Sequence, residues 1–178
     1  MKNIVIFCLL ISAADALAQV VGKAFPNLEA ETVEDKKVSL PADVRGKYTL
    51  LGLAYSRKSE DELNTWFRPV FETFIQKPTG LMAGIGYDVY VYFVPMFTGI
   101  NAAATGTAKR KALKNTDPHL LPHILFYQGE LKPYKEALDF EKRDIPYFFV
   151  LDPEGNIIFA TSGSYTADKL EEVEEVIE

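Results

Sequence analysis

The sequence predicts one α/β domain in which helices cover a mixed β-sheet, and three observations predict it. Residues 48–55 form an almost unbroken apolar run of strand length, which is typical of a strand buried on both faces. Apolar residues then recur at spacings of three and four over residues 63–75, as they do on one face of a helix. Residues 145–161 read as strand, Pro/Gly turn and strand. Strands that alternate with helices and end in a hairpin favour a layered α/β fold.

The first 18 residues have the composition of a signal peptide. Lys2 supplies positive charge, residues 4–11 are apolar, and Ala16 and Ala18 form a small-residue cleavage site before Gln19. We therefore expect a mature domain of residues 19–178 that is exported, either to the periplasm or out of the cell. The apolar run is shorter than the roughly 20 residues that a membrane-spanning helix needs, and no transmembrane segment is expected in the mature chain.

The charge balance argues against nucleic acid as a partner. The 178 residues carry 19 Lys and Arg against 25 Asp and Glu, a net charge of -6, and no basic stripe that could neutralise phosphates. The single cysteine, Cys8, lies in the predicted leader. We therefore expect a mature domain with no disulfide, no thiolate metal site and no cofactor, which folds by packing alone.

The N-terminal half is predicted to hold a β-hairpin and the main helix. Two short strands within residues 27–33 and 38–40 flank a polar turn, ahead of the central strand. Ser59, with Glu62 three residues later, predicts a capping box at the start of the helix. Pro69 lies inside the helical pattern, so we expect the helix to kink or break just before it.

The C-terminal half is predicted to continue the alternation of strands and helices. Its expected elements are a strand over 87–94, a helix over 102–114, a largely irregular segment over 118–129 with a short apolar stretch at 124–127, strands over 147–151 and 157–161 joined by a turn, and a last helix from Thr166.

Three short motifs occur in a characteristic order along the chain. They are Val-Gly-Lys-Ala-Phe-Pro at 21–26, Val-Ser-Leu at 38–40 with Gly-Lys at 46–47, and the Ile-Pro hairpin at 145–158. Together they resemble the thioredoxin-like superfamily in its exported, peroxiredoxin-related (AhpC/TSA and TlpA-like) branch. The resemblance implies a three-layer thioredoxin-like fold with a mixed central sheet and an N-terminal β-hairpin.

The resemblance places the two catalytic cysteines of that family at Ser56 and Ser59, in the loop Ser56-Arg57-Lys58-Ser59. Disulfide exchange needs a thiolate to attack sulfur and a sulfur to leave, and a hydroxyl group does neither. The acids at 60–62 would also disfavour a thiolate, because a redox cysteine needs an electropositive helix start. The Thr and Pro that precede a peroxidase cysteine are absent as well. The sequence predicts that catalytic residues of this kind are missing.

The resemblance also implies a cis-proline opposite the degenerate loop, at Pro146. With Ile145 it would form a groove for an extended peptide, and strand-like capture of peptides is a known binding mode. The alternative is that Pro146 only begins an edge strand.

Other readings of single residues remain open. Ser56 and Ser59 could be nucleophiles, although no Gly-x-Ser-x-Gly elbow surrounds them and capping explains Ser59. Arg57 and Lys58 could bind an anion or a partner's carboxylate, or could simply be hydrated. His119 and His123 have the spacing of a helical metal pair, but prolines flank them and no third ligand is evident, so we expect no metal.

A fainter similarity, through residues 66–69 and the stretch from Tyr134 to the hairpin, is to mitochondrial ATP-synthase assembly factors with a thioredoxin-like domain. We predict a redox-inactive, exported protein that binds a protein or an extended peptide, with a possible role in assembly. The alternative is an enzyme: a thiol-disulfide oxidoreductase or peroxidase-family protein that uses partner cysteines, or a hydrolase built on other residues.

Overall fold

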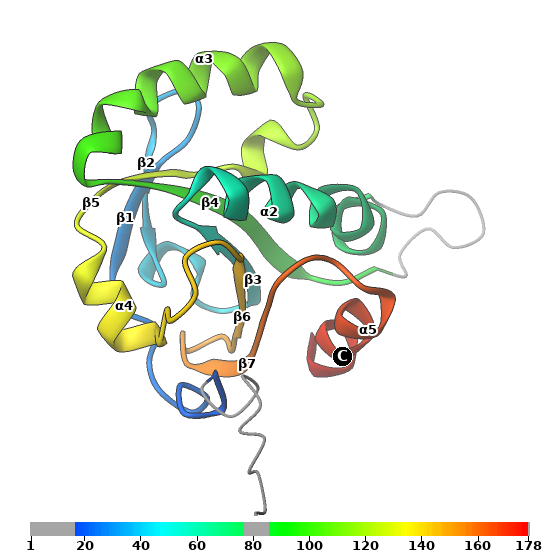
Figure 1. Ribbon diagram of the computed structural model, residues 1–178. Helices are drawn as coiled ribbons and strands as arrows, with labels where there is room; N and C mark the ends of the chain where they lie inside the picture. Colours follow the sequence, from blue (N-terminus) through cyan, green and yellow to red (C-terminus); the bar gives the residue numbers. More distant parts are fainter. Residues whose placement is uncertain (1–16, 77–85, 178) are drawn as a thin grey trace, which may run out of the picture.

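The computed structural model describes residues 17–76 and 86–177, and its centre is a seven-stranded mixed sheet with the order β2-β1-β5-β4-β3-β6-β7 (Figure 1). Strands β3, β4 and β5 run parallel to one another, and all other neighbours are antiparallel. The strands are β1 (Leu28–Glu31), β2 (Lys37–Leu40), β3 (Tyr48–Ala54), β4 (Val89–Thr98), β5 (Phe126–Gly129), β6 (Tyr147–Leu151) and β7 (Ile157–Ser162).

Helices cover both faces of the sheet and give the predicted three layers (Figure 1). Helices α2, α3 and α5 lie on one face, while α4 and the N-terminal segment lie on the other. The helices are α2 (Arg57–Val70), which continues as a π-helical turn (Phe71–Ile75), α3 (Thr105–Asn115), α4 (Lys132–Leu138) and α5 (Ala167–Ile177), with short 3-10 turns at Ala42–Val44, Gly99–Ala104 and Leu121–His123.

Strand β3 shows why the apolar run at its position predicts a central strand. Leu50 and Ala54 face α2 and α5, whereas Leu51 and Leu53 face the opposite layer. All four side chains are buried. Apolar residues are therefore favoured on both faces of β3 and not only at every second position.

Helix α2 begins one turn earlier than the sequence predicts, so the expected capping box of Ser59 and Glu62 is wrong. Ser56 is the N-cap, with extended backbone angles (φ -142°, ψ 160°), and its hydroxyl accepts the N–H of Ser59. The Ser59 side chain in turn accepts the N–H of Ser56. An N-cap residue must be non-helical, and Ser59 already lies inside the helix. The carboxylate of Glu62 instead accepts a hydrogen bond from the hydroxyl of Ser164.

Pro69 neither breaks α2 nor ends it at the expected residue. The α-helix runs through Pro69 to Val70 and then widens into the π-helical turn. The N–H of Phe71 donates to the backbone carbonyls of both Arg68 and Phe67. Because proline has no N–H, the ladder already lacks one bond at this point, and a local widening of the helix satisfies the neighbouring groups.

Gly52 allows α2 to pack closely on the sheet. A Cβ atom at this position would lie 2.6 Å from Phe148 and 2.9 Å from Leu63 of α2. Such distances are impossible for real atoms unless the neighbours move. The close approach fixes the height of α2 above β3 and β4, and with it the position of the side chains that α2 directs along the sheet.

Several elements differ from the sequence-based expectation. Strand β4 extends to Thr98, and the expected helix start at 102 is a 3-10 turn that precedes α3. The segment expected to be irregular contains β5, and α4 has no counterpart in the prediction. The predicted leader falls almost entirely outside the described residues, as does Cys8.

Candidate functional site

The degenerate loop lies at the C-terminal end of β3, where Ser56 and Ser59 are joined by hydrogen bonds. Ser59 is completely buried; its Oγ accepts the N–H groups of Tyr55 (3.1 Å) and Ser56 (2.9 Å) and donates to the carbonyl of Ser56 (2.9 Å). Ser56 is 8% exposed, and its Oγ lies 3.2 Å from Ser59 Oγ. Both hydroxyl groups are therefore used to hold the strand-to-helix turn.

The segment before β6 lies against this loop, as the resemblance implies. The hydroxyl of Ser56 donates to Asp144 Oδ1 (3.1 Å), and the hydroxyl of Tyr55 donates to the carbonyl of Lys142 (2.9 Å). The hydroxyl of Tyr147 accepts the N–H of Lys142 and donates to the carbonyl of the same residue. Burial, with a smaller effect of Tyr147, raises the pKa of Tyr55 to about 12, so Tyr55 remains a neutral donor. The contact between the two segments is thus built from neutral donors and one carboxylate.

The expected cis bond at Pro146 is wrong. Within the described residues the cis peptide bond is Leu40–Pro41, and the bond before Pro146 is trans. The carbonyl of Pro146 accepts the N–H of Gly163 (2.9 Å), so the backbone simply continues the pairing of β6 with β7. The depression at Ile145 has a volume of about 20 Å³, which is room for about one water molecule. The structure brings Ile145 and Ser56 to the same end of the sheet, but with a shallow surface between them.

Arg57 and Lys58 are both exposed at the first turn of α2. No hydrogen bond or ion pair among the described residues involves either side chain. They form the solvent-facing part of the degenerate loop, so the partner surface expected there is accessible.

The two histidines lie elsewhere. His119 packs on Phe71, with ring centroids 6.4 Å apart, and Phe71 follows the end of α2, roughly 20 Å from Ser56 at about 1.5 Å per residue. His123 Nδ1 lies 2.9 Å from the carbonyl of Val91. Neither ring is beside the serines. Within residues 17–76 and 86–177 no three His, Cys, Asp or Glu side chains are grouped to hold a metal ion.

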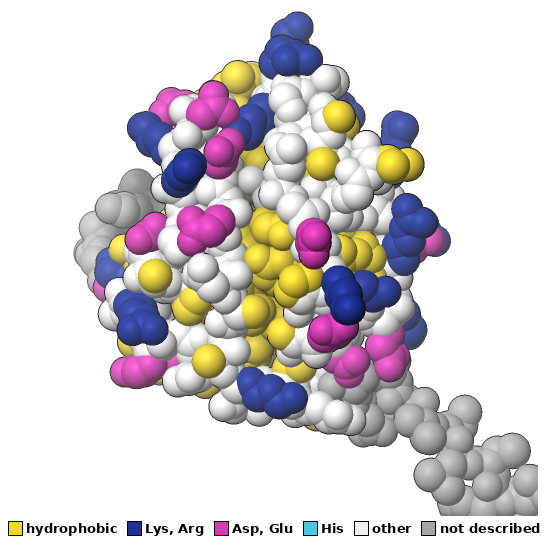
Figure 2. All heavy atoms as spheres, turned by 90° about the vertical axis from the view of Figure 1, so that its left-hand side faces the viewer, with side chains coloured by type: hydrophobic (Ala, Val, Ile, Leu, Met, Phe, Trp, Pro, Cys, Tyr) yellow, Lys and Arg dark blue, Asp and Glu magenta, His cyan; other side chains and the backbone are white. Residues whose placement is uncertain are grey.

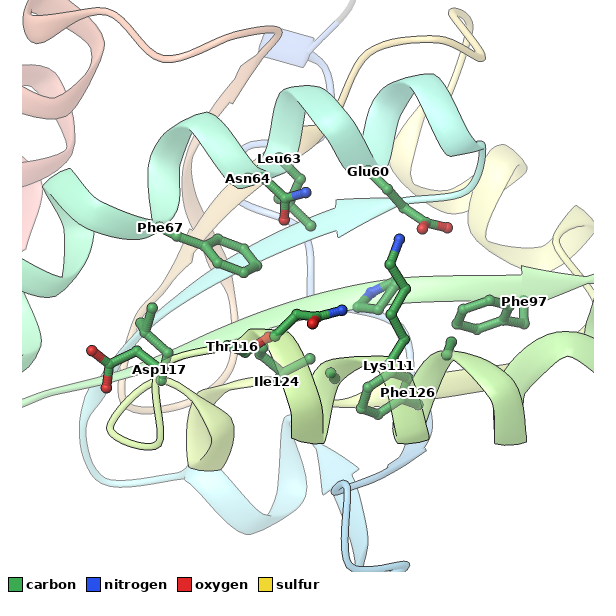
Figure 3. A pocket seen from close by; sticks show the side chains of 15 residues that line it. Glu60, Leu63, Asn64, Phe67, Phe97, Lys111, Thr116, Asp117, Ile124 and Phe126 are labelled. Atoms are coloured by element: carbon green, nitrogen blue, oxygen red, sulfur yellow. The ribbon is translucent and has the colours of Figure 1, made fainter.

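A larger feature, which the sequence does not predict, is a pocket of about 380 Å³ between α2 and α3 (Figure 3). Its floor is apolar and comes from α2, β4, β5 and the turn before β5. Figure 2, seen from the side of β5 and α4, shows hydrophobic side chains at the bottom of a hollow with charged side chains around it. The side chains that form the floor include Leu63, Phe67, Phe97, Ile124 and Phe126.

Polar side chains line the mouth of this pocket from both helices. Glu60 and Asn64 come from α2, and Lys111 and Asn115 come from α3. In Figure 3 the Lys111 side chain rises from α3 toward Glu60. Burial is the largest cause that raises the pKa of Glu60, followed by the charge of Asp61, while Lys111 and Arg57 act in the opposite direction. The first turn of α2 therefore belongs both to the degenerate loop and to the pocket.

Helix α3 is held away from α2 by ion pairs at its other side. The ammonium of Lys109 donates to Glu31 and to Asp35 at 2.7 Å each, and it lies 5.9 Å from the ring centre of Phe126. The Lys109 side chain is only 10% exposed. These contacts join α3 to the hairpin of β1 and β2, so the gap between the two helices is a fixed part of the fold.

The sequence offers little warning of this pocket. Phe67 belongs to the apolar face of the predicted helix and Phe126 to the short apolar stretch at 124–127, whereas Phe97 lies beyond the strand predicted over 87–94, and nothing in these patterns indicates a cavity. The pocket depends on where α3, which follows the 3-10 turn Gly99–Ala104, lies relative to α2, and no pattern in the sequence specifies that placement.

Comparison with solved structures shows that the chain has a thioredoxin-like fold. The reduced 2-Cys peroxiredoxin of Plasmodium vivax is similar, with a TM-score of 0.57 and 15% identity over 89% of this chain and 96% of that one. A putative thiol:disulfide interchange protein DsbE from Chlorobium tepidum has a TM-score of 0.55 and 14% identity, over 88% and 94%. BsSco, a member of the Sco family of cytochrome c oxidase assembly proteins, has a TM-score of 0.55 and 10% identity, over 86% and 91%.

No protein-family model and no curated protein matches the chain. At the identities found, the similarity to solved structures concerns the fold. The fold prediction is therefore confirmed, and the chain carries one cysteine, Cys8. In the part of the chain that the structure describes, none of the helices has the length and apolar character to span a bilayer.

Proposed function

We propose that this chain is a redox-inactive protein of thioredoxin-like fold, exported to the cell envelope, that binds a protein or peptide partner at the end of the sheet where α2 begins. The observation that carries the proposal is the bonding of Ser56 and Ser59. The resemblance assigns both to the positions of the family's thiols; both hydroxyl groups hold the turn, and that of Ser56 also donates to Asp144. A hydroxyl group cannot exchange disulfides, so association with other molecules is the remaining role of this surface.

The surface around the loop supports binding. Arg57 and Lys58 are exposed and without a described partner, and the bond from Ser56 to Asp144 brings the half-buried Ile145, next to Asp144 in sequence, to the same end of the sheet. Two cations next to an apolar side chain are suited to a partner segment that carries acidic and apolar residues. Rim charges of this kind steer association more than they add affinity.

The first test is enzymatic. The purified chain from Gln19 onward should neither reduce insulin nor consume peroxide above a heat-denatured sample. Reproducible turnover in either assay would overturn the redox-inactive part of the proposal.

The second test is positional. A photoreactive amino acid at Lys58 should crosslink a discrete partner in the cells that make the protein, and the same group at Glu175, exposed on α5, should not. The yield at Lys58 should fall several-fold in the Arg57→Glu and Ile145→Ala backgrounds. Equal yields at the two positions, or yields unchanged in both backgrounds, would contradict binding at the loop.

Export is tested separately. Cell fractionation should recover the protein outside the cytoplasm, with a mature N-terminus near Gln19. A cytoplasmic protein with residues 1–18 intact would remove the envelope from the proposal and leave the binding surface unaffected.

A further inference from the structure

The pocket between α2 and α3 is floored by aromatic side chains: Phe67 is half-buried, and Phe97 and Phe126 are 8% and 4% exposed. Protein interiors are normally close-packed, yet about 380 Å³ stays open above Phe67, Phe97 and Phe126 (Figure 3). The volume is within the usual range of ligand-binding pockets, and so is the composition of an apolar floor with a few polar groups at the mouth. The ion pairs of Lys109 keep α3 in place, so the pocket is preformed.

The mouth holds a carboxylate without a hydrogen-bond donor. Glu60 is half-buried, and no described side chain or backbone N–H bonds its carboxylate. Lys111 points toward it but makes no ion pair with it within 4.0 Å. A half-buried carboxylate gains from a charged donor, so a ligand that supplies one is complementary to this position.

The charges around the mouth favour a basic ligand. Glu60, Asp61 and Asp117 are acidic, whereas Lys111 and Arg57 are basic. The acids therefore outnumber the bases by one, and the most buried of them, Glu60, has no donor within the described residues.

Two amides line the pocket, one from each helix. Asn64 is exposed on α2 and Asn115 is exposed on α3, and neither side chain is hydrogen-bonded within the described residues. Each carboxamide offers both a donor and an acceptor, which matches the alternating N–H and carbonyl groups of an extended chain. The polar groups lie along the rims and the floor has none, which suits a side chain inserted from above.

We propose that this pocket binds an extended segment of the partner, with one aromatic side chain in the pocket and a neighbouring Lys or Arg beside Glu60. This inference rests on the proposed function, because it names the segment that the partner would present. The aromatic anchor would pack on Phe67, Phe97 and Phe126, and its main chain would pass between Asn64 and Asn115. Anchors of this kind supply most of the binding energy at interfaces.

The test uses the chain from Gln19 onward and three blocked peptides. They are acetyl-Ala-Phe-Lys-Ala-amide, the same peptide with Ala in place of Phe, and the same peptide with Glu in place of Lys. Titration followed by amide chemical shifts should show saturable changes at Leu63, Phe67 and Phe97 with the first peptide. The peptide without Phe should bind at least about tenfold more weakly, and the peptide with Glu about threefold more weakly.

Matched variants on one helix locate the site. Ala112 lines the pocket, whereas its neighbour Leu113 is 54% exposed. Ala112→Phe should abolish the shifts, and Leu113→Phe should leave the dissociation constant within about twofold. Emission of the single tryptophan, Trp66, which is completely buried, reports whether each variant is folded. Glu60→Gln should remove the preference for Lys over Glu.

The outcomes separate the two proposals. Peptides that bind Ala112→Phe as well as the parent protein, or that bind equally with and without Phe, would overturn the pocket proposal, even if crosslinking at Lys58 succeeds. Saturable binding of the dye 1-anilinonaphthalene-8-sulfonate in the pocket, with none of the peptides bound, would also overturn it, in favour of a small apolar ligand. Peptide binding that Ala112→Phe abolishes supports the pocket, and a failed crosslink at Lys58 would then count against the loop alone.

Discussion

The hydroxyl of Ser56 donates a hydrogen bond to a carboxylate oxygen of Asp144, 3.1 Å away across 88 residues of sequence. This bond connects the end of β3 to the segment that leads into β6. It also places a carboxylate beside Ser56, one of the two positions that the resemblance assigns to the family's cysteines. A like charge at this distance disfavours ionisation of a thiol, so the loop is unsuited to redox chemistry even if sulfur is restored.

Restoring both thiols tests this directly. The Ser56→Cys/Ser59→Cys variant should form an intramolecular disulfide on mild oxidation, because the two Oγ atoms already lie 3.2 Å apart. It should reduce insulin slowly. Adding Asp144→Asn should increase the rate by about tenfold, corresponding to about one unit in the thiol pKa. The measurement is the initial rate of insulin precipitation with dithiothreitol.

Each single cysteine variant is the control and should stay inactive, since one thiol cannot complete the exchange. If Asp144→Asn leaves the rate of the double variant unchanged, the carboxylate does not control that position.

Ser59→Ala should lower the free energy of unfolding by about 1–3 kcal/mol. The change removes the acceptor of two backbone N–H groups, those of Tyr55 and Ser56, at a site with no exposure to water. Urea unfolding followed by Trp66 emission measures the loss. Ser164→Ala, at an exposed serine that bonds Glu62, should change the free energy by less than about 0.5 kcal/mol; equal losses in the two variants would show that the buried serine is not special.

Lys109→Met should loosen the attachment of α3. Burial opposes the charge of the Lys109 ammonium, but the hydrogen bonds to Asp35 and Glu31 outweigh it and raise the pKa of this group. Methionine keeps the apolar contact with Phe126 and removes both ion pairs. We expect a loss of about 1–2 kcal/mol, because both acids remain hydrated.

Hydrogen exchange gives the more specific result for this variant. The amides of α3 should exchange faster than in the parent protein, while those of α5 should not change. Lys132→Met removes an exposed pair with Glu136 at 3.8 Å and should be neutral within about 0.5 kcal/mol. Unchanged exchange in α3 would mean that the hairpin contact does not hold the helix.

The layered fold can be predicted from the sequence because each of its central elements has one clear local signal. The run that forms β3 is buried on both faces, so periodicity and burial agree, and the Pro/Gly turn between β6 and β7 leaves little choice of conformation. Helix α4 does not follow from the sequence, because it has seven residues with a proline at its start. Its two buried residues, Tyr134 and Leu138, give too short a pattern to separate from a loop.

The candidate site also has features that the sequence predicts and features that it does not. The position of Ser56 and Ser59 follows from motif order, but their hydrogen-bond roles depend on which residue has extended backbone angles, and two serines three apart leave that choice open. The bond before Pro146 is trans, and the residue types around an X-Pro bond do not determine its isomer. The pocket depends on where α3 lies relative to α2, a tertiary feature that no local sequence pattern determines.

Glu60 gives the last prediction, because burial and the charge of Asp61 raise its pKa above the ordinary value of 4.5. A carboxyl group with a higher pKa in the folded protein binds more protons when folded, so stability is lost as pH rises from about 4.5 through the folded pKa. Glu60→Gln removes this loss. The variant should therefore gain stability relative to the parent protein as pH rises through this window, and the gain should be constant above it.

The measurement is urea unfolding at a series of pH values, with the difference between the two proteins plotted against pH. Glu175→Gln, at an exposed position on α5, is the control and should give a nearly flat difference. A difference for Glu60→Gln with the opposite slope would mean that the folded protein stabilises the ionised carboxylate. Glu60 would then already have a donor, and the argument for a basic residue in the pocket's ligand would fail.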